Sequence, residues 1–257
     1  MWLALLLVVV GVVLLLVGVV AGPFVLLKRL PARAEFDGIS VVKDVLVCAG
    51  VVQIGEHEAA LVDSGADPHA KSVLAELARR GMKAEDVKAI LLTHGHHDHT
   101  GGIRQFPNAQ VMALAAEADV VEGRSMGGAP FFRFSSPRPT GIHLARTLQD
   151  GDTVQSGALT ARVFALPGHT PGSAAYAIGP VLFLGDSANQ DRRGRLRGAP
   201  WIFSASTRQN RRALVNLAER LASDHAIRTL VFSHSAPLTR NGVAPLLEFA
   251  SKANMES

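Results

Sequence analysis

The stretch "THGHHDHTGG", residues 93–102, places four histidines and one aspartate within ten positions. It starts at the end of an apolar run, "VKAILLT", which is typical of a buried strand. On an α-helix the side chains of His94 and His96 would lie about 200° apart around the axis. On an extended segment, residues two apart point to the same side. We therefore expect His94 and His96 to project together from the strand end, with Asp98 and His99 on the segment that turns away.

Such a cluster of imidazole and carboxylate groups indicates a metal site, because these side chains are ligands for zinc, iron and manganese. The chain has a single cysteine, Cys48, so it can form neither an internal disulfide nor a CxxC zinc knuckle. A metal site here would therefore be built from histidine and carboxylate groups.

Three further polar residues follow apolar runs later in the chain. His169 lies in "LPGHTPGS", Asp186 in "LFLGDS" and His234 in "VFSHSAP". Taken singly, they have simpler explanations: a turn between two prolines, a cap after a glycine, and a histidine at a strand end. Taken together, they are candidates to complete the metal site, because strand ends deliver side chains to one rim of a sheet.

The chain of 257 residues is long enough for one sizeable core, and its overall composition, with 48% hydrophobic and 19% charged residues, is not that of a disordered protein. Short β-rich runs interleave with helical patterns at 69–81, 207–224 and 243–253, of which 207–224 is amphipathic, without strict βαβ alternation. This pattern predicts an α/β fold of four layers, in which two mixed β-sheets are flanked by helices.

The first segment, residues 1–27, carries no charged side chain, and its stretch 2–27 would span roughly 39 Å as a helix, more than the bilayer core of about 30 Å. It predicts an uncleaved transmembrane anchor, with a cleaved signal peptide as the alternative. We expect residues 28–36 to form a juxtamembrane linker and residues 37–257 to form the catalytic domain. The basic residues after the apolar run favour a cytoplasmic domain over a periplasmic or extracellular one.

The motifs "THGHHDH", "PGHTPGS", "FLGDS" and "VFSH" resemble, in order and spacing, those of the metallo-β-lactamase superfamily, the αββα metallohydrolases. The resemblance runs from Ile39 to His234, and the motif sequences are most similar to those of the glyoxalase II (hydroxyacylglutathione hydrolase) group. It implies a first metal held by His94, His96 and His169, a second held by Asp98, His99 and His234, and Asp186 bridging the two. It also implies that Asp63, in "LVDSG", orients ligands without touching metal.

The implied activity is hydrolysis of a small-molecule ester, thioester or lactone. Two divalent ions, zinc foremost with iron or manganese as alternatives, would lower the pKa of a shared water and yield an attacking hydroxide. Asp98 is the candidate for positioning that water or moving a proton. Alternatives are a phosphodiesterase or nuclease using the arginine-rich segment 191–198, and a non-hydrolytic sensor or assembly protein. No inserted nucleic-acid-binding domain is visible, so we expect no nucleic-acid partner.

Two loops are candidates to line the substrate pocket, namely residues 124–141 and 194–206. In the second loop, Trp201 and Phe203 could contact an apolar group, and Arg193 or Arg195 an anion. Glyoxalase II enzymes usually carry a helical C-terminal domain that binds glutathione, whereas only a short segment follows His234 here. This difference argues against a glutathione thioester as the substrate.

Overall fold

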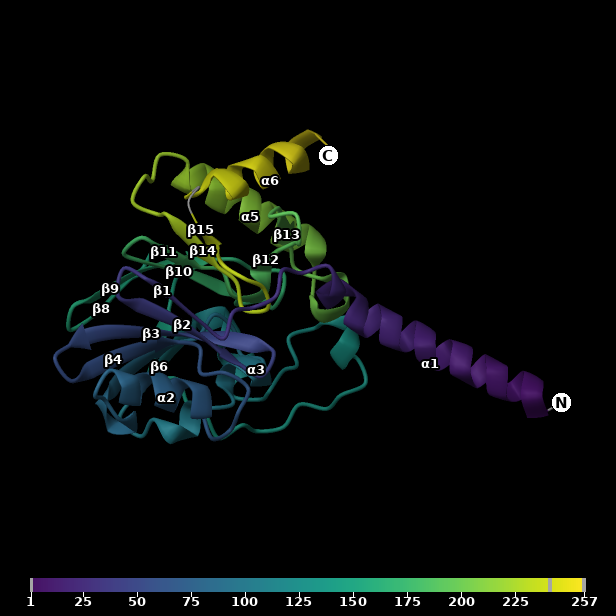
Figure 1. Ribbon diagram of the computed structural model, residues 1–257, viewed down its shortest axis with the longest axis horizontal. Coiled ribbons are helices and arrows are strands. Elements are labelled where there is room, and N and C mark those ends of the chain that lie inside the picture. The colour runs from purple at the N-terminus through teal and green to yellow at the C-terminus, as the bar shows by residue number, and fades with distance from the viewer. Residues whose placement is uncertain (1, 240–241, 256–257) are drawn as a thin grey trace.

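The computed structural model describes residues 2–239 and 242–255 and shows two β-sheets packed face to face with helices outside them (Figure 1). The first sheet contains, in spatial order, β1 (Arg33–Phe36), β2 (Ile39–Asp44), β3 (Val47–Gly55), β4 (Glu58–Val62), β5 (Val87–Leu91), β6 (Gln110–Leu114) and β7 (Arg146–Leu148). The second contains β15 (Leu238–Thr239), β14 (Thr229–Val231), β11 (Val181–Phe183), β10 (Ala174–Ile178), β9 (Leu159–Ala165) and β8 (Thr153–Ser156). A small ribbon pairs β12 (Ala188–Gln190) with β13 (Leu196–Gly198).

The helices cover the outer faces of both sheets. On the first sheet lie α2 (Lys71–Arg79) and the short α4 (Ala118–Val121), on the second lie α5 (Thr207–Leu221) and α6 (Ala244–Met255), and the single turn α3 (His97–Thr100) follows β5. Single 3₁₀ turns connect several elements: η1 (Ala84–Asp86), η2 (Ile103–Gln105), η3 (Ala115–Glu117), η4 (Pro130–Phe132), η5 (Gly185–Ser187) and η6 (Trp201–Phe203).

A continuous apolar core fills the space between the sheets and holds them together. It joins side chains such as Val41, Val52 and Leu91 from the first sheet to Val163, Tyr176 and Phe183 from the second. Separate apolar layers lie beneath α2 and beneath α5 and α6. Each sheet is therefore buried on both faces, which explains why its strands read as near-continuous apolar runs. The predicted α/β fold of two mixed sheets flanked by helices is confirmed.

The N-terminal segment forms helix α1 (Trp2–Val25), which extends away from the body (Figure 1). The predicted anchor also includes Met1 and several side chains that lie outside the described part of the chain. Among the residues that are described, no helix is long and apolar enough to cross a bilayer, so the transmembrane anchor and its lipid contact are not supported. The end of the segment packs on the body instead, where the ring centroids of Phe24 and Phe203 are 5.5 Å apart.

The segment predicted as a linker, 28–36, differs from that expectation. Its second half is β1, which pairs antiparallel with β2, and Leu30 packs against the core between the sheets. Alternating exposure along Arg33–Phe36 marks it as an edge strand. The folded body therefore begins before residue 37.

Glu76, a buried carboxylate of α2, ties this edge of the first sheet to the helix. It accepts hydrogen bonds from Ser40 Oγ at 2.6 Å, Arg80 Nε at 2.9 Å, and the guanidinium groups of Arg33 and Arg79 at 2.8 Å and 2.7 Å. Burial alone would raise the pKa of this carboxyl, but the hydrogen bonds from its basic neighbours and from Ser40 hold it well below its usual range.

Glu76→Gln should lower the free energy of unfolding at neutral pH by about 2 kcal/mol, because charge-assisted hydrogen bonds are lost. A carboxyl whose folded pKa is depressed stabilises the fold above its unfolded pKa, near 4.5, and loses that contribution as the pH falls below it. Urea unfolding should therefore show a smaller difference from wild type at a pH of about 3.5 than at neutrality. The exposed Glu85→Gln is the matched control, and an equal effect of both variants would contradict the role of Glu76.

Candidate metal centre

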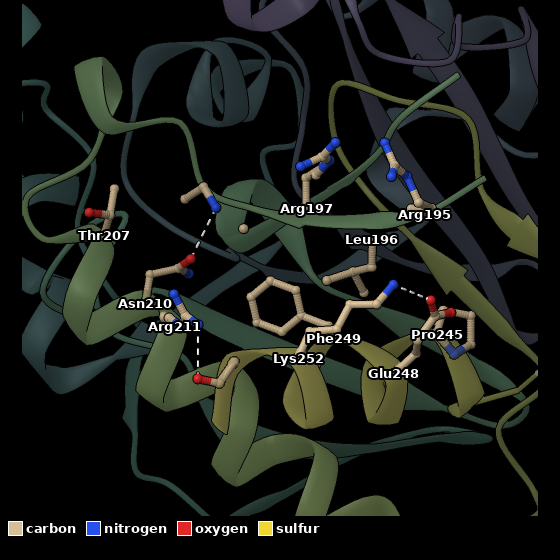
Figure 2. Close-up of a pocket in the computed structure, with 13 residues that line it drawn as sticks. Arg195, Leu196, Arg197, Thr207, Asn210, Arg211, Pro245, Glu248, Phe249 and Lys252 are labelled. Carbon is tan, nitrogen blue, oxygen red and sulfur yellow. Dashed lines mark hydrogen bonds and ion pairs between the residues drawn. The ribbon is translucent and has the colours of Figure 1, made fainter. Parts of the chain in front are cut away.

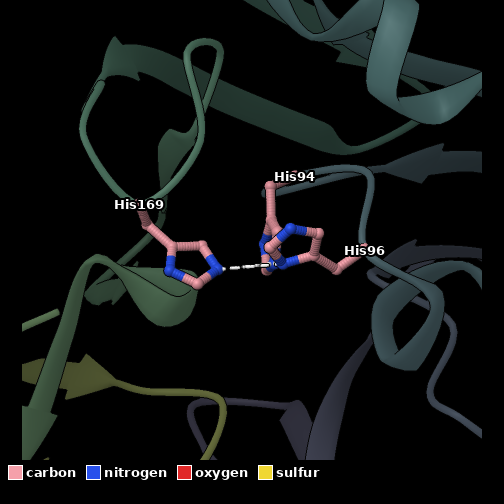
Figure 3. Close-up of side chains that lie close together, drawn as sticks. All are labelled: His94, His96 and His169. Atoms are coloured by element: carbon pink, nitrogen blue, oxygen red, sulfur yellow. Dashed lines mark hydrogen bonds between the residues drawn. The ribbon is translucent and has the colours of Figure 1, made fainter. Parts of the chain in front are cut away.

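Three histidine rings from two distant loops converge on one point (Figure 3). His94 Nε2 lies 3.0 Å from His96 Nδ1, and His169 Nε2 lies 3.2 Å and 3.1 Å from these two atoms. Two nitrogens bound to one tetrahedral zinc ion at about 2.0–2.1 Å would lie roughly 3.3 Å apart. The triangle therefore has the dimensions that three imidazole ligands of a single ion require.

A second cluster combines two carboxylates with two imidazoles: Asp98, His99, Asp186 and His234. His234 Nε2 lies 3.1 Å from Asp186 Oδ2 and 3.3 Å from Asp98 Oδ2. His99 Nε2 lies 3.3 Å from Asp186 Oδ1 and 3.6 Å from Asp98 Oδ2. The mixed oxygen and nitrogen donors suit zinc, iron and manganese.

Asp186 joins the two clusters, since its Oδ2 is also 3.5 Å from His169 Nε2. Its Oδ1 and the Nε2 atom of His99 are buried and have no hydrogen-bond partner among the described residues, although they face each other. Buried polar atoms without partners cost about 1–3 kcal/mol each. A bound cation would supply the partner that these buried atoms lack. The donor set of the two clusters therefore fits two metal ions. All seven residues proposed from the sequence lie here together.

Strand ends of both sheets bring these side chains to one rim. His94 and His96 follow β5 of the first sheet, whereas Asp186 and His234 follow the parallel strands β11 and β14 of the second. The sheets approach closely at Gly185, whose φ is +55° and where a Cβ atom would lie 2.7 Å from Thr93 Oγ1. Glycine at this position therefore permits Asp186 to reach the residues after β5.

Outer hydrogen bonds fix the ring orientation of two histidines. His99 Nδ1 lies 2.8 Å from Asp63 Oδ2, and His234 Nδ1 lies 2.9 Å from the Leu46 carbonyl oxygen. With the Nδ1 proton donated outward, the Nε2 lone pair of each ring faces the cluster, as is usual for metal-binding histidines. Asp63 also accepts hydrogen bonds from the backbone and hydroxyl of Thr93. It therefore orients residues of the site without entering it, as the resemblance implied.

The electrostatics of the two clusters differ. Burial lowers the pKa of His169 to about 3 and holds the pKa values of His94 and His96 below their ordinary value. These three rings are therefore neutral at neutral pH, which is the form that binds metal.

In the second cluster, the charged form of each group is stabilised by its neighbours. Burial would raise the pKa of Asp98, but His99 and His234 lower it to about 2, and the pKa of Asp186 is held well below its usual range in the same way. Conversely, burial would lower the pKa of His234, but Asp186 and Asp98 raise it to about 10. Without metal, the two carboxylates thus hold His99 and His234 as imidazolium groups, and a divalent cation would take the place of their Nε2 protons.

Glu117, which was not predicted from the sequence, links the two loops that carry the histidines of the first cluster. Its carboxylate accepts hydrogen bonds from Gly95 N, Thr170 Oγ1 and Gly172 N, each at 2.8 Å. Gly95 lies between His94 and His96, and Thr170 follows His169, so one buried side chain links both histidine loops. Burial raises the pKa of Glu117 to about 7, although all three donors favour the carboxylate. No motif surrounds Glu117, because its role depends on contacts far apart in the sequence.

A cavity of about 800 Å³ opens above both clusters and exposes Asp98, whose side chain is 39% accessible. Each predicted pocket loop contributes an aromatic side chain: Phe132, whose ring lies 5.0 Å from that of His96, and Phe203. Trp201 does not line this cavity and is 57% exposed, so its expected substrate contact is not supported.

The arginine-rich segment lines a different cavity of about 380 Å³ between β13, α5 and α6 (Figure 2). Arg195 and Arg197 both pair with Asp191, at 2.9 Å and 3.1 Å, so their charge is directed into their own loop. This arrangement favours a self-contained surface loop over an anion-binding site for a nuclease. The remaining histidines are exposed: His57, His69, His97, His143 and His225.

Glu117→Gln should lower zinc affinity by about tenfold to a hundredfold, because loss of an outer hydrogen-bond partner loosens the ligands it positions. It should also lower the free energy of unfolding by about 2 kcal/mol, since an amide cannot accept all three hydrogen bonds. Competition with a chromophoric chelator measures the first quantity and urea unfolding of metal-free protein the second. Glu122→Gln, which alters a surface pair with Arg124, is the control; equal zinc affinities in the two variants would argue against the role of Glu117.

Comparison with known proteins identifies the family. The model of the metallo-beta-lactamase superfamily matches residues 44–234. A protein named hydroxyacylglutathione hydrolase from Gloeobacter violaceus is 32% identical over 194 residues, covering 70% of this chain and 66% of its own length. One of the same name from Methylobacillus flagellatus is 33% identical over 195 residues, covering 72% and 68%. The chain thus spans about two thirds of the length of these relatives.

Solved structures show the same fold at lower sequence identity. BJP-1, a subclass B3 metallo-beta-lactamase of Bradyrhizobium japonicum, superposes with a TM-score of 0.64 at 22% identity, over 90% of this chain and 94% of its own. The metallo-beta-lactamase MIM-1 from Novosphingobium pentaromativorans gives 0.64 at 24% identity, over 87% and 88%. With its motifs, its clusters of donors and its fold in agreement, the chain belongs to the metallo-beta-lactamase superfamily.

Proposed function

We propose that this protein is a binuclear metal-dependent hydrolase that cleaves a small-molecule thioester, ester or lactone, with zinc as the foremost metal and iron or manganese as alternatives. The observation that carries the proposal is the convergence of seven donor groups into two clusters that share Asp186. One cluster, with three neutral imidazoles, would hold the first ion. The other, with Asp98, His99 and His234, would hold the second.

When bound, two divalent cations supply Lewis acidity that lowers the pKa of water and offsets negative charge developing on the substrate. The chain's own residues prepare this chemistry. Asp63 and the Leu46 carbonyl fix two imidazole rings, and Glu117 fixes the loops of the first cluster. Phe132 and Phe203 line the cavity beside these donors. A pre-ordered site of this kind needs little rearrangement during the reaction.

Asp98 is the residue that we place closest to the reacting atoms. Its carboxylate is the most exposed of the seven donors and faces the cavity. It can therefore orient a water molecule and accept a hydrogen bond from it. Its neighbours His99 and His234 keep it charged.

A thioester is the leading substrate class because the curated relatives are named for hydrolysis of hydroxyacylglutathione. Esters and lactones present the same attacked carbonyl. The pairing of Arg195 and Arg197 with Asp191 gives the phosphodiesterase alternative no added support. Bound metal without turnover would instead favour a sensor or assembly role.

His96→Ala should reduce thioester or ester hydrolysis by at least about a thousandfold, because one ligand of the first ion is lost. The matched control is His97→Ala, which removes an exposed neighbouring imidazole outside both clusters and should retain wild-type kcat/KM. The assay is hydrolysis of a panel containing a hydroxyacylglutathione, an acyl ester, a lactone and bis-p-nitrophenyl phosphate, with metal content determined on the same samples.

Chelation of the wild-type enzyme should abolish this activity, and zinc should restore it. Activity that survives both chelation and His96→Ala would overturn the proposed mechanism. Preferential cleavage of the phosphodiester would favour the nuclease alternative instead.

A further inference from the structure

The cavity above the metal centre is apolar on the side away from the ligands. Its floor contains His96, Asp98, His169, Asp186 and His234. Its walls come from the end of α1, the β2–β3 turn, η4 and η6, and are formed by the apolar side chains Val20, Phe24, Leu27, Leu30, Val45, Leu46, Val47, Phe132 and Phe203. A volume of about 800 Å³ is far larger than an attacked carbonyl group alone would need.

The turn between β2 and β3 exposes two apolar residues at this cavity at an energetic cost. Asp44 pairs with Val47, so Val45 and Leu46 form a two-residue hairpin turn, and they are 62% and 73% exposed. Val45 has φ +54°, a conformation that favours glycine and is unfavourable for a β-branched residue. Polar residues or glycine would be more stable here, and strain of this kind is concentrated at ligand-binding sites.

The same turn is tied to the metal centre, because the Leu46 carbonyl oxygen holds His234 Nδ1 at 2.9 Å. Phe24, from the end of α1, also lies beside this histidine, with its ring centroid 5.3 Å from that of His234. The apolar walls are therefore continuous with the ligands, so a group bound against them would remain attached to a carbonyl held at the floor.

Three basic side chains also line the cavity. Lys28, Arg29 and Lys43 all line the cavity and are exposed, and none forms an ion pair within residues 2–239 and 242–255. Three unpaired cations beside an apolar wall complement a ligand that combines an apolar chain with negative charge.

We infer that the substrate is an anionic amphiphile: a thioester or ester whose acyl part is a medium or long apolar chain and whose thiol or alcohol part is negatively charged. The inference rests on the proposed function and specifies its substrate class. The acyl chain lies against Phe24, Val45 and Leu46, and the anionic part is bound by Lys28, Arg29 and Lys43. One water cleaves the bond between the carbonyl carbon and sulfur or oxygen, giving a carboxylate, a thiol or alcohol, and a proton.

The first test compares acetyl- and octanoyl-coenzyme A with zinc-loaded protein, below the concentration at which the longer compound aggregates. Full burial of each of the six added methylenes is worth up to about 0.8 kcal/mol, so burial of about half of them should make kcat/KM favour the octanoyl compound by about a hundredfold. Phe24→Asp and Leu46→Asp should each reduce this preference by about tenfold. The matched control, Leu15→Asp, places the same charge at an exposed position of α1 that does not line the cavity and should leave the preference unchanged.

A second pair of variants tests the strain and the charge. Val45→Gly should raise the melting temperature while lowering the octanoyl preference, a combination that a merely structural turn would not produce. Lys43→Glu should raise KM for octanoyl-coenzyme A several-fold more than for the uncharged octanoyl-N-acetylcysteamine. Equal effects on the two compounds would overturn the anionic part of the inference.

A binding measurement separates this inference from the hydrolase proposal. Octanoate should bind to the wild type in calorimetry with a negative heat-capacity change, and Phe24→Asp should weaken that binding. Hydrolysis without any chain-length preference would overturn the inference and leave the proposed function intact. Octanoate binding without turnover of any substrate would contradict the hydrolase proposal while supporting an amphiphile-binding cavity. Absence of octanoate binding would overturn the assignment of the cavity as the site for the acyl chain.

Discussion

The structure is organised around the crowding of polar donors at one rim of an otherwise apolar sandwich. Three neutral imidazoles meet nitrogen to nitrogen at 3.0–3.2 Å, and two carboxylates face two further imidazoles beside them. Lone pairs at these distances require a proton or a metal ion between them, since buried polar groups without a partner are costly. The fold holds them in place with a supporting layer of hydrogen bonds from Asp63, Glu117 and the Leu46 carbonyl oxygen. The positions of the metal donors at the rim therefore depend on the folded structure that holds these supporting groups.

Much of this arrangement could be predicted from local patterns. Apolar runs that end in a histidine or aspartate identified both the buried strands and the metal-donor residues at their ends. A strand that is buried on both faces has apolar side chains along its paired length, so its polar residues lie beyond its last paired residue. Helical spacing of apolar residues also predicted helices near α2 and α5, which are clearly amphipathic, and near α6, which is less so. The two sheets follow from the irregular order of these elements.

Other features depend on contacts that no local pattern reports. Glu117 resembles any acidic residue at a helix start, and its role arises only when the loops around His94 and His169 fold over it. The apolar N-terminal segment illustrates the opposite case. Its composition predicted a bilayer anchor, whereas in the structure Phe24 and Leu27 contribute to a cavity wall. Composition alone does not distinguish the partners that apolar side chains will contact.

The delivery of donors from both sheets has a consequence for biosynthesis. A ribosome releases His94, His96, Asp98 and His99 long before it releases Asp186 and His234, which follow strands β11 and β14 of the second sheet. The first half of a nascent chain therefore carries an incomplete coordination sphere. Reactive capacity arises only when the second sheet docks on the first, so acquisition of metal would report that co-translational folding has been completed.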